Sequence, residues 1–401
     1  MASPALRDAG VAFDVEGVRG VDGVAELRRR FPEARVIELG EAAILPGLVN
    51  AHTHLELTLI GPPPSGGISK GPIRFVDWIL ELRSRAMRVV ERESQTRQAV
   101  VEGVRQSLAC GVTAVGDIAG DTHASRAALA GSVLKGVSFG EVLGMAGRAG
   151  QFEARLAAAI DRALERPGLM AGIEPHAPYS VDLVNYQRCI EAARDGSFPI
   201  ATHLAETAEE AEFLADHSGE FARLWSALDA WTPGVSTFSG GAIRAMHSVG
   251  LLNLPAVLAH VNYVDDAEME LLAKGRASVV YCPRTHAYFG HPPHRFREML
   301  ERGINVALGT DSAVSSPDLN LLEELRWVRR IYPEIEARTL FEMVTMRAAA
   351  ALGMSDRIGA IREDSAADFA VFRARSAEPL EEILESGESA MQTWVDGVRV
   401  V

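Results

Sequence analysis

Eight short apolar runs recur along this chain, and each is followed by helical or loop sequence. They span residues 44–54, 112–118, 137–143, 169–176, 199–203, 256–260, 278–282 and 304–311. Strands that alternate with helices form parallel sheets, and eight strand–helix units are what a closed (β/α)8 barrel, the TIM barrel, requires. We therefore predict an α/β fold whose TIM barrel covers residues 44–360.

The stretches between the runs have helical periodicity in places. Residues 95–108 (QTRQAVVEGVRQSL) place Val100, Val101, Val104 and Leu108 at a helical period. A doubly wound open sheet is the competing architecture. It is disfavoured because polar residues follow many of the predicted strands around the whole set, whereas an open sheet gathers its site at one switch point.

The two ends of the chain carry a different pattern. Short alternating apolar runs occur at 11–13 and 34–39, and again at 368–372 and 392–401, where Asp396-Gly397 signals a tight turn. We predict that residues 1–43 and 361–401 pair as one small β-sandwich module beside the barrel. The Pro/Gly-rich loop 61–74 and the long excursion 207–255 are expected to hang over the mouth of the barrel, where such loops shape substrate pockets.

Composition excludes several classes of function. The chain has 54 acidic against 40 basic residues and a formal net charge of -14, so we predict no nucleic-acid partner. Its three cysteines, Cys110, Cys189 and Cys282, are scattered, which argues against a disulfide framework and a cysteine zinc site. The N-terminus lacks the basic and apolar segments of a signal peptide, and no window approaches about 18 uncharged apolar residues. We predict a cytoplasmic protein without a membrane segment.

The first apolar run ends in Leu-Pro-Gly-Leu-Val-Asn-Ala-His-Thr-His, which carries His52 and His54. Side chains at positions i and i+2 of a strand project to the same face, so the two imidazoles lie side by side. Two converging nitrogen donors are the start of a metal site. A pair of surface histidines has the same spacing, so this motif alone leaves both interpretations open.

Other potential ligands stand at the ends of further predicted strands. His203, His260 and Asp311 each close an apolar run, the position where barrel enzymes keep catalytic groups. A core histidine with one hydrogen bond explains any single case, but not four histidines and a carboxylate at strand ends, so a metal site is favoured. Glu206 follows His203 by three residues, where it is either a proton shuttle over the metal or a solvated acid heading the segment TAEEAEF.

Taken together, these residues resemble the amidohydrolase superfamily. The motifs are ILPGLVNAHTHLE at 44–56, HLAET at 203–207, the lone His260, and LGTDS at 308–312 followed by Ser316 and LNL at 319–321. They are most similar to the branch of cytosine deaminase, adenosylhomocysteine deaminase and chlorohydrolases. The resemblance covers nearly the whole chain and implies a barrel with a small sandwich domain.

The resemblance implies one divalent metal ion held by His52, His54, His203 and Asp311. Zinc and iron are both expected, since imidazole and carboxylate ligands suit either. Binuclear relatives bridge two metals with a carboxylated lysine late in the fourth strand, where this chain reads LMAGIEPH and has no lysine. A binuclear site is therefore disfavoured, and Glu174 is the alternative bridging group in that strand.

The implied reaction is hydrolytic deamination of an aminopurine-like ring or a related aromatic N-heterocycle. Metal-bound hydroxide attacks the ring carbon, Asp311 takes the proton of the water, His260 orients the nucleophile and Glu206 protonates the ring nitrogen before ammonia leaves. Two alternatives stay open. The first is a chlorohydrolase or a cyclic amide hydrolase with the same site residues. The second is a catalytically inactive metal-binding barrel, and the presence of the complete ligand set together with Glu206 argues against it.

The resemblance also indicates which residues touch a small-molecule substrate. His176, in EPHAPYS, matches the position where this branch contacts its substrate. Many relatives carry Ser-Asn after Cys-Pro-x, where this chain has Thr285-His286, so Arg284 and His286 either bind an anionic or hydroxyl-rich part of the ligand or brace the loop.

Two further blocks narrow the branch. FVDW at 75–78 and FGEVLG at 139–144 resemble those of aminodeoxyfutalosine deaminases, which deaminate an adenine nucleoside. Relatives usually carry another strand before residues 11–15, so either the module is smaller here or the N-terminus is truncated. A homodimer is the expected assembly because it is the commonest closed symmetry.

Overall fold

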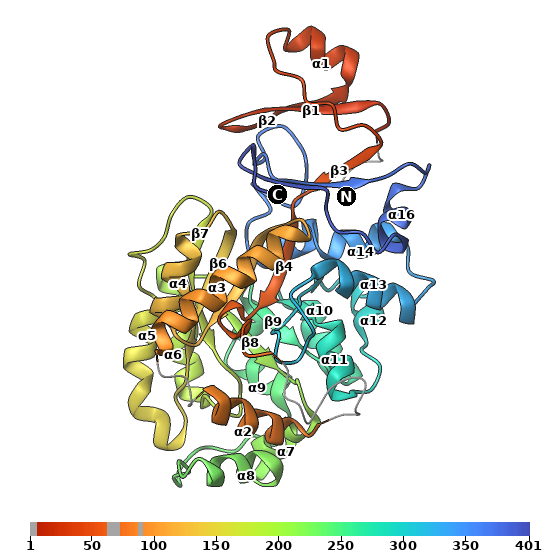
Figure 1. The fold of residues 1–401 in the computed structure, drawn as a ribbon. Helices are drawn as coiled ribbons and strands as arrows, with labels where there is room; N and C mark the ends of the chain where they lie inside the picture. The colour runs from red at the N-terminus through yellow and green to blue at the C-terminus, as the bar shows by residue number, and fades with distance from the viewer. Residues whose placement is uncertain (1–5, 62–72, 87–90) are drawn as a thin grey trace.

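The computed structural model describes residues 6–61, 73–86 and 91–401, and eight parallel strands lie at its centre (Figure 1). They form two four-stranded sheets. The first sheet contains β4 (Leu48–Thr53), β5 (Val112–Ala119), β6 (Lys135–Val142) and β7 (Leu169–Pro175). The second sheet contains β8 (Ala201–Leu204), β9 (Val257–His260), β10 (Ser278–Tyr281) and β11 (Val306–Leu308).

Isolated parallel bridges join the two sheets at both edges. Ile173 of β7 pairs with Ile200 just before β8, and Thr53 of β4 pairs with Asp311 just after β11. At the second junction the amide of Asp311 donates a hydrogen bond of 3.1 Å to the carbonyl of His52. The strand order β4 to β11 and these contacts are consistent with the predicted TIM barrel.

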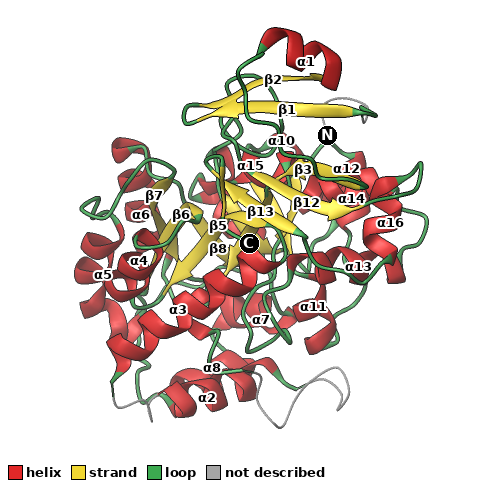
Figure 2. Ribbon diagram, turned by 45° about the horizontal axis from the view of Figure 1, so that its top comes forward, coloured by secondary structure: helices red, strands yellow, loops and turns green. Residues whose placement is uncertain are grey.

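Alternate residues of the strands face one shared apolar cluster. Val49 and Ala51 of β4, Val137 and Phe139 of β6, and Val280 of β10 all belong to it and are fully or almost fully buried. A spacing of two is the period at which strand side chains share a face. The other face of the strands packs under the helices that surround them in Figure 2, which explains why the strands are apolar along their whole length.

Helices connect the strands, and α3 confirms the helix predicted over residues 95–108. Within the described residues the helices are α1 (Val24–Arg30), α2 (Phe75–Ala86), α3 (Arg92–Ala109), α4 (Thr122–Ala130), α5 (Phe152–Ala159), α6 (Leu183–Gly196), α7 (Ala208–Asp216), α8 (Gly219–Ala227), α9 (Ala242–Ser248), α10 (Asp266–Lys274), α11 (Pro283–Phe289), α12 (Phe296–Glu301), α13 (Leu321–Ile331), α14 (Ala337–Met343), α15 (Met346–Ala351) and α16 (Pro379–Glu385), with short 3-10 helices η1 (Leu55–Leu57), η2 (Ala146–Gln151) and η3 (Leu251–Asn253).

The long excursion between β8 and β9 folds into α7, α8 and α9, and α8 packs against α2 at the end of the molecule opposite the chain termini (Figure 1). Most of the predicted loop 61–74 lies outside the described residues. Among the helices of the described residues, none combines the length and apolar character that crossing a membrane requires.

A strand near the N-terminal end of the chain pairs with strands near the C-terminal end. β3 (Ala42–Pro46) pairs antiparallel with β12 (Phe369–Arg373). On its other side β12 pairs with β13 (Gln392–Val395), which in turn pairs with β14 (Val398–Arg399), and both pairings are antiparallel. The hairpin of β1 (Ala9–Asp14) and β2 (Gly17–Gly23) is a separate sheet that packs on this one, with the rings of Phe13 and Phe369 at 5.4 Å. Asp396 and Gly397 both have positive φ angles and form the predicted turn between β13 and β14.

Two details of the predicted strands are wrong. The run 44–54 is two strands that break at Gly47, where a Cβ atom would lie 2.1 Å from Oγ1 of Thr113, so β3 joins the terminal sheet and the parallel strands begin at Leu48. Residues 34–39 form no strand, because they run exposed along the surface, with Val36 and Ile37 at 53% and 44% exposure, and pair with no described strand. The helix α1 that precedes them was not predicted.

Candidate metal centre

Four histidines and Asp311 come together at the carboxyl ends of β4, β8, β9 and β11. Nε2 of His54 lies 3.4 Å from Oδ1 of Asp311 and 3.2 Å from Nε2 of His203. Nε2 of His52 lies 3.7 Å from the same oxygen of Asp311. His52, His203 and His260 form a second group whose nitrogen atoms all lie within 4.8 Å of one another. The carboxyl ends of parallel strands share one edge of the sheet, so side chains that are as far apart in sequence as His52 and Asp311 converge there.

Several of these nitrogens are buried without a partner. Both ring nitrogens of His52 and Nε2 of His260 have no hydrogen bond among the described residues. Buried polar atoms are normally satisfied, because leaving one unpaired costs about 1–3 kcal/mol. Burial lowers the pKa of His52, His54, His203 and His260, so these imidazoles are neutral and keep a lone pair for a ligand.

The carboxylate of Asp311 is the charged member of the cluster. Burial disfavours its charged form, but the imidazoles of His52, at 3.7 Å, His54 and His260 outweigh burial and lower the pKa of Asp311 below its ordinary value. A charged carboxylate among neutral imidazoles is the donor set that zinc and iron accept in proteins. The residues present therefore fit a divalent cation.

The backbone at the strand ends is held in a left-handed conformation that residues other than glycine rarely adopt. His260 has φ 74, Val261 φ 52, Asp311 φ 56 and Ala205 φ 49. Such left-handed residues cost energy and concentrate at functional sites, where the surrounding structure fixes them. The carbonyl of His260 accepts a 2.8 Å hydrogen bond from Nε2 of His294, which helps to hold this turn.

Glu206 follows β8 and lies against His260, with Oε1 3.5 Å from its Nε2. Its side chain is buried, so the interpretation of Glu206 as a solvated acid is wrong. Burial, together with the charges of Asp311 and Glu210, raises the pKa of Glu206 well above its ordinary value and favours the protonated form. Glu210 of α7 accepts the amides of Ala205 and Glu206 at 3.2 and 3.1 Å and so fixes the turn that carries this acid.

His176 lies beside the cluster, with its ring centre 5.1 Å from that of His203. Its Nδ1 is 2.7 Å from Oγ of Ser180, and this hydroxyl donates to the carbonyl of Ala177 at 3.0 Å. Because the hydroxyl proton is engaged, Nδ1 of His176 is the donor and its Nε2 is a free acceptor. The next aromatic ring is Tyr179, which meets His176 edge-on at 5.6 Å.

Arg284 and His286 lie on α11 and contact protein partners. Nε of Arg284 lies 2.6 Å from the buried carboxylate of Glu324, and its Nη2 lies 2.9 Å from Asp318. Nε2 of His286 lies 2.8 Å from the carbonyl of Pro292. The contacts of Arg284 join α11 to α13, so for Arg284 they correspond to the loop-bracing alternative rather than to an open ligand contact.

Three residues support the cluster in ways that the sequence did not predict: Glu174 was considered only as a bridge between two metals, and Asp117 and His294 were not considered. Glu174 places Oε1 2.8 Å from Nδ1 of His203, Asp117 accepts the amide of Leu55 at 2.9 Å, and His294 bonds the backbone of His260. The spacing of Glu174 and His176, two residues apart at a strand end, was the available signal. Asp117 and His294 gave none, because their partners are distant in sequence.

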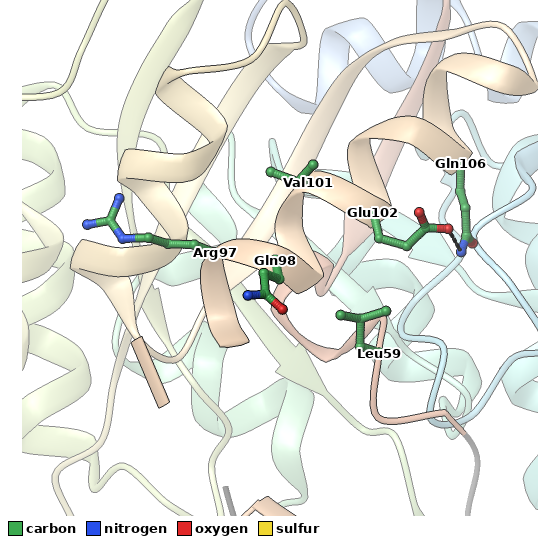
Figure 3. Close-up of a pocket in the computed structure, with 6 residues that line it drawn as sticks. All are labelled: Leu59, Arg97, Gln98, Val101, Glu102 and Gln106. Carbon is green, nitrogen blue, oxygen red and sulfur yellow. Dashed lines mark hydrogen bonds between the residues drawn. The ribbon is translucent and has the colours of Figure 1, made fainter. Parts of the chain in front are cut away.

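A surface pocket lined by Leu59 and the exposed face of α3 lies apart from the cluster (Figure 3). Its volume is about 530 Å³ and its other lining residues are Arg97, Gln98, Val101, Glu102 and Gln106. It contains no histidine, and the amide of Gln106 is already bonded to Glu102 at 2.9 Å. The buried cluster is therefore the candidate active site.

Parallel strands of an α/β fold with a histidine–aspartate cluster at their carboxyl ends are typical of the class of metal-binding hydrolases. Within this class the chain belongs to the amidohydrolase family, whose model matches residues 43–400. The resemblance seen in the sequence is thus confirmed. The protein is a hydrolase of carbon–nitrogen bonds other than peptide bonds, as its relatives' names also indicate.

Relatives of similar sequence are named as nucleoside deaminases. The aminodeoxyfutalosine deaminase of Deinococcus radiodurans is 29% identical over 345 residues, which are 82% of this chain and 78% of the relative. The 5-methylthioadenosine/S-adenosylhomocysteine deaminase of Syntrophobacter fumaroxidans is 26% identical over 91% of this chain and 80% of its own.

Solved structures share the fold over almost the whole chain. Aminofutalosine deaminase of Helicobacter pylori, in complex with methylthio-coformycin, has a TM-score of 0.84 at 22% identity and covers 99% of this chain and 96% of its own. Atrazine chlorohydrolase TrzN of Arthrobacter aurescens, complexed with zinc, has a TM-score of 0.83 at 19% identity over 99% and 91% of the two chains.

Proposed function

We propose that this protein is a mononuclear deaminase of adenine-nucleoside-like substrates, with one divalent cation held by His52, His54, His203 and Asp311. One observation carries the proposal: these four side chains are linked by nitrogen–nitrogen and nitrogen–oxygen distances of 3.2–3.7 Å, and Glu206 and Asp311 share a further group with His260. The names of the relatives support the substrate class. We further infer that the two parallel sheets close into a single barrel and that the terminal sheets form its sandwich module.

The spacing of the histidine nitrogens supports a cation between them. The Nε2 atoms of His54 and His203 are 3.2 Å apart, and ligands that each lie about 2.0–2.1 Å from a zinc ion span such a separation. Zinc and iron both fit. A bound cation would supply a water molecule whose pKa falls from 15.7 toward about 7.

The side chains around that water divide the proton transfers. Charged Asp311 accepts the proton of the attacking water, and neutral His260 hydrogen-bonds its oxygen. Glu206, held in its acid form, donates a proton to the ring nitrogen next to the carbon that is attacked. The amino group would take the proton held by Asp311 and leave as ammonia, and the added hydroxyl would return a proton to Glu206 and become the carbonyl oxygen of the product.

Aromatic side chains next to His176 support a planar heterocycle as substrate. Tyr179 stacks on Phe221 at 4.0 Å, and Phe75 of α2 packs against both rings. Apolar aromatic walls with a few polar groups are typical of ligand pockets. His176, with its free Nε2, is the best placed of the three predicted substrate-binding residues, whereas Arg284 is engaged by Glu324.

A chlorohydrolase is the second candidate, because TrzN shares the fold. To separate the candidates, the purified protein is loaded with zinc or iron(II) and the bound metal is measured. The release of ammonia and of chloride is then assayed with adenine nucleosides, pterins and chlorotriazines. Ammonia release from adenine nucleosides is expected. Stoichiometric metal without turnover on the whole panel would favour the inactive barrel, and chloride release alone would favour the chlorohydrolase.

Substitution of Glu206 tests its role directly. We expect E206Q to lower kcat by about 100- to 10,000-fold, the usual contribution of a general acid, while the bound metal stays at the wild-type level. The matched control is E212Q, which neutralises an exposed acid on α7. An E206Q enzyme with normal metal content and near-normal kcat contradicts the assignment.

We also propose a cytoplasmic homodimer. The three cysteines are buried and unpaired, which supports a reducing compartment. Closed twofold symmetry is the commonest arrangement of soluble oligomers. Sedimentation velocity of the zinc-loaded protein tests the dimer, and a monomer at micromolar concentration contradicts it.

A further inference from the structure

Glu174 is the penultimate residue of β7, and its side chain is fully buried next to the metal centre. Its Oε1 lies 2.8 Å from Nδ1 of His203, on the neighbouring strand β8. The two strands approach each other through the bridge between Ile173 and Ile200, one residue before Glu174. The bridge thus brings the two strands together next to the side-chain contact.

The surroundings of His203 decide which of its nitrogens carries the proton. Nδ1 has two neighbours, the carboxylate of Glu174 and the carbonyl of His176 at 3.2 Å. The carbonyl oxygen of His176 can only accept, so Nδ1 carries the proton, which lies between this carbonyl and the carboxyl oxygen of Glu174. Nε2 of neutral His203 then has no proton, and it is this atom that faces Nε2 of His54.

A purely structural role does not explain a carboxylate at this position. The second oxygen of Glu174, Oε2, is buried and has no hydrogen-bond partner among the described residues. Half-satisfied buried acids are costly, and apolar side chains of similar volume usually replace them without loss of stability. A nearby cation of charge +2 offsets this cost, because its field favours a negative charge one ligand away.

We propose that Glu174 is a positioning residue that fixes His203 in the Nδ1–H tautomer, aims its Nε2 at the cation and strengthens that nitrogen as a ligand. The inference rests on the proposed metal site. Its chemistry is that of carboxylate–histidine–metal triads, in which loss of the carboxylate weakens metal binding by about 10- to 100-fold.

The test compares E174A and E174Q with the wild-type protein. Zinc affinity is measured by competition with a chromophoric chelator after the metal has been removed. We expect E174A to bind zinc about 10- to 100-fold more weakly. E174Q retains an acceptor oxygen for Nδ1–H but loses the charge, so its affinity should lie between those of E174A and the wild-type protein.

The matched control is E165Q. Glu165 accepts the amide of Ala171 at 3.0 Å, at the opposite end of β7, and glutamine retains that acceptor. E165Q should keep wild-type zinc affinity, and equal losses in E165Q and E174Q would overturn the inference, because they would report only damage to the strand. Wild-type zinc affinity in both E174A and E174Q would also overturn it.

A second measurement separates this inference from the metal site itself. The ¹⁵N chemical shifts of His203, assigned with an H203Q variant, report the tautomer in the metal-free protein. We expect the Nδ1–H form in the wild-type protein and in E174Q, and a mixture of tautomers in E174A. If the wild-type protein binds no zinc, the proposed function fails, whereas the tautomer shift still decides the role of Glu174. An unchanged tautomer in E174A overturns that role.

Discussion

His260 shows how one residue of the site depends on its backbone. It ends β9 with φ 74, a conformation that costs a non-glycine residue about 1–3 kcal/mol. Its carbonyl accepts from Nε2 of His294 at 2.8 Å, and its ring lies 5.4 Å from that of His203. Burial lowers the pKa of His294 to about 3, so His294 is a neutral donor near pH 7. The donor thus stabilises the turn that aims His260.

This contact gives a prediction for His294. H294F removes the donor and should lower the free energy of unfolding by about 1–3 kcal/mol, the cost of an unpaired buried carbonyl. It should also lower kcat, because the ring of His260 loses its fixed direction. H294Q retains an amide donor at the equivalent distance and should recover most of both losses. Urea denaturation and steady-state kinetics of the zinc-loaded enzymes measure the effects, and equal kcat values for H294F and wild-type enzyme contradict the prediction.

For single residues of the site, the sequence predicted those that stand at the end of an apolar run. It did not predict contacts that depend on the register between neighbouring strands. His203, His260 and Asp311 were found because the carboxyl ends of parallel strands meet at one edge. The contact of Glu174 with His203 was missed because the spacing within one strand does not give the register of the neighbouring strand. The role of Arg284 stayed open because its partner Glu324 lies 40 residues away.

Among the elements, the segment from β10 to the start of α12 carries three histidines beside the candidate metal centre. His294 stacks on Tyr281 at 4.2 Å, and His286 meets both His291 and His294 at ring distances of 5.4 and 5.9 Å. Burial lowers the pKa of His286 and His291 to about 4. The segment therefore packs around neutral imidazoles, and protonation of any of them opposes the folded state.

This packing predicts how stability depends on pH. The histidine pKa in the unfolded chain is about 6.5, above the values of His286, His291 and His294 in the folded protein, so only the unfolded chain binds protons as the pH falls below 6.5. The free energy of unfolding should therefore drop by about 1 kcal/mol for each of the three between pH 7.5 and 5.5. Urea denaturation of the metal-free protein at the two pH values measures this drop. In H291N the drop in the free energy of unfolding should be smaller by about 1 kcal/mol, because one of the three histidines is absent. The same drop in H291N and wild-type protein contradicts the assignment.

The elements themselves were predicted well where apolar runs are long and less well at the module. Each of the eight parallel strands overlaps a predicted run, and β5, β6 and β8 extend one or two residues beyond theirs. Strands that are buried on both faces are nearly continuous in their apolar sequence, which makes them easy to recognise. The break at Gly47 was missed because β3 and β4 form one continuous apolar sequence that changes sheet. Residues 34–39 alternate like a strand but find no described partner, and pairing is what makes a strand.

For the whole molecule, the terminal sheets and the parallel strands are joined by polar contacts in addition to apolar packing. Lys135, the first residue of β6, places Nζ 2.8 Å from Asp368, which directly precedes β12, and 2.5 Å from Asp396. The carbonyl of Asp368 also accepts the amide of Gly47, where the chain passes from one sheet to the other. Lys135 and Asp368 are both buried, so this pair connects the two parts at their shared core.

Removal of Lys135 should therefore loosen the two parts together. K135M leaves Asp368 as an uncompensated buried charge and should lower the free energy of unfolding by about 3–5 kcal/mol. The double variant K135M/D368N also removes the unpaired buried charge of Asp368, so it should be less destabilised than K135M. The control is K274M, whose lysine pairs with Glu270 at 3.7 Å on the exposed face of α10, and which should change stability by less than about 1 kcal/mol. Urea denaturation followed by tryptophan fluorescence measures all three, and a loss in K135M no larger than that in K274M would show that apolar packing alone holds the terminal sheets to the parallel strands.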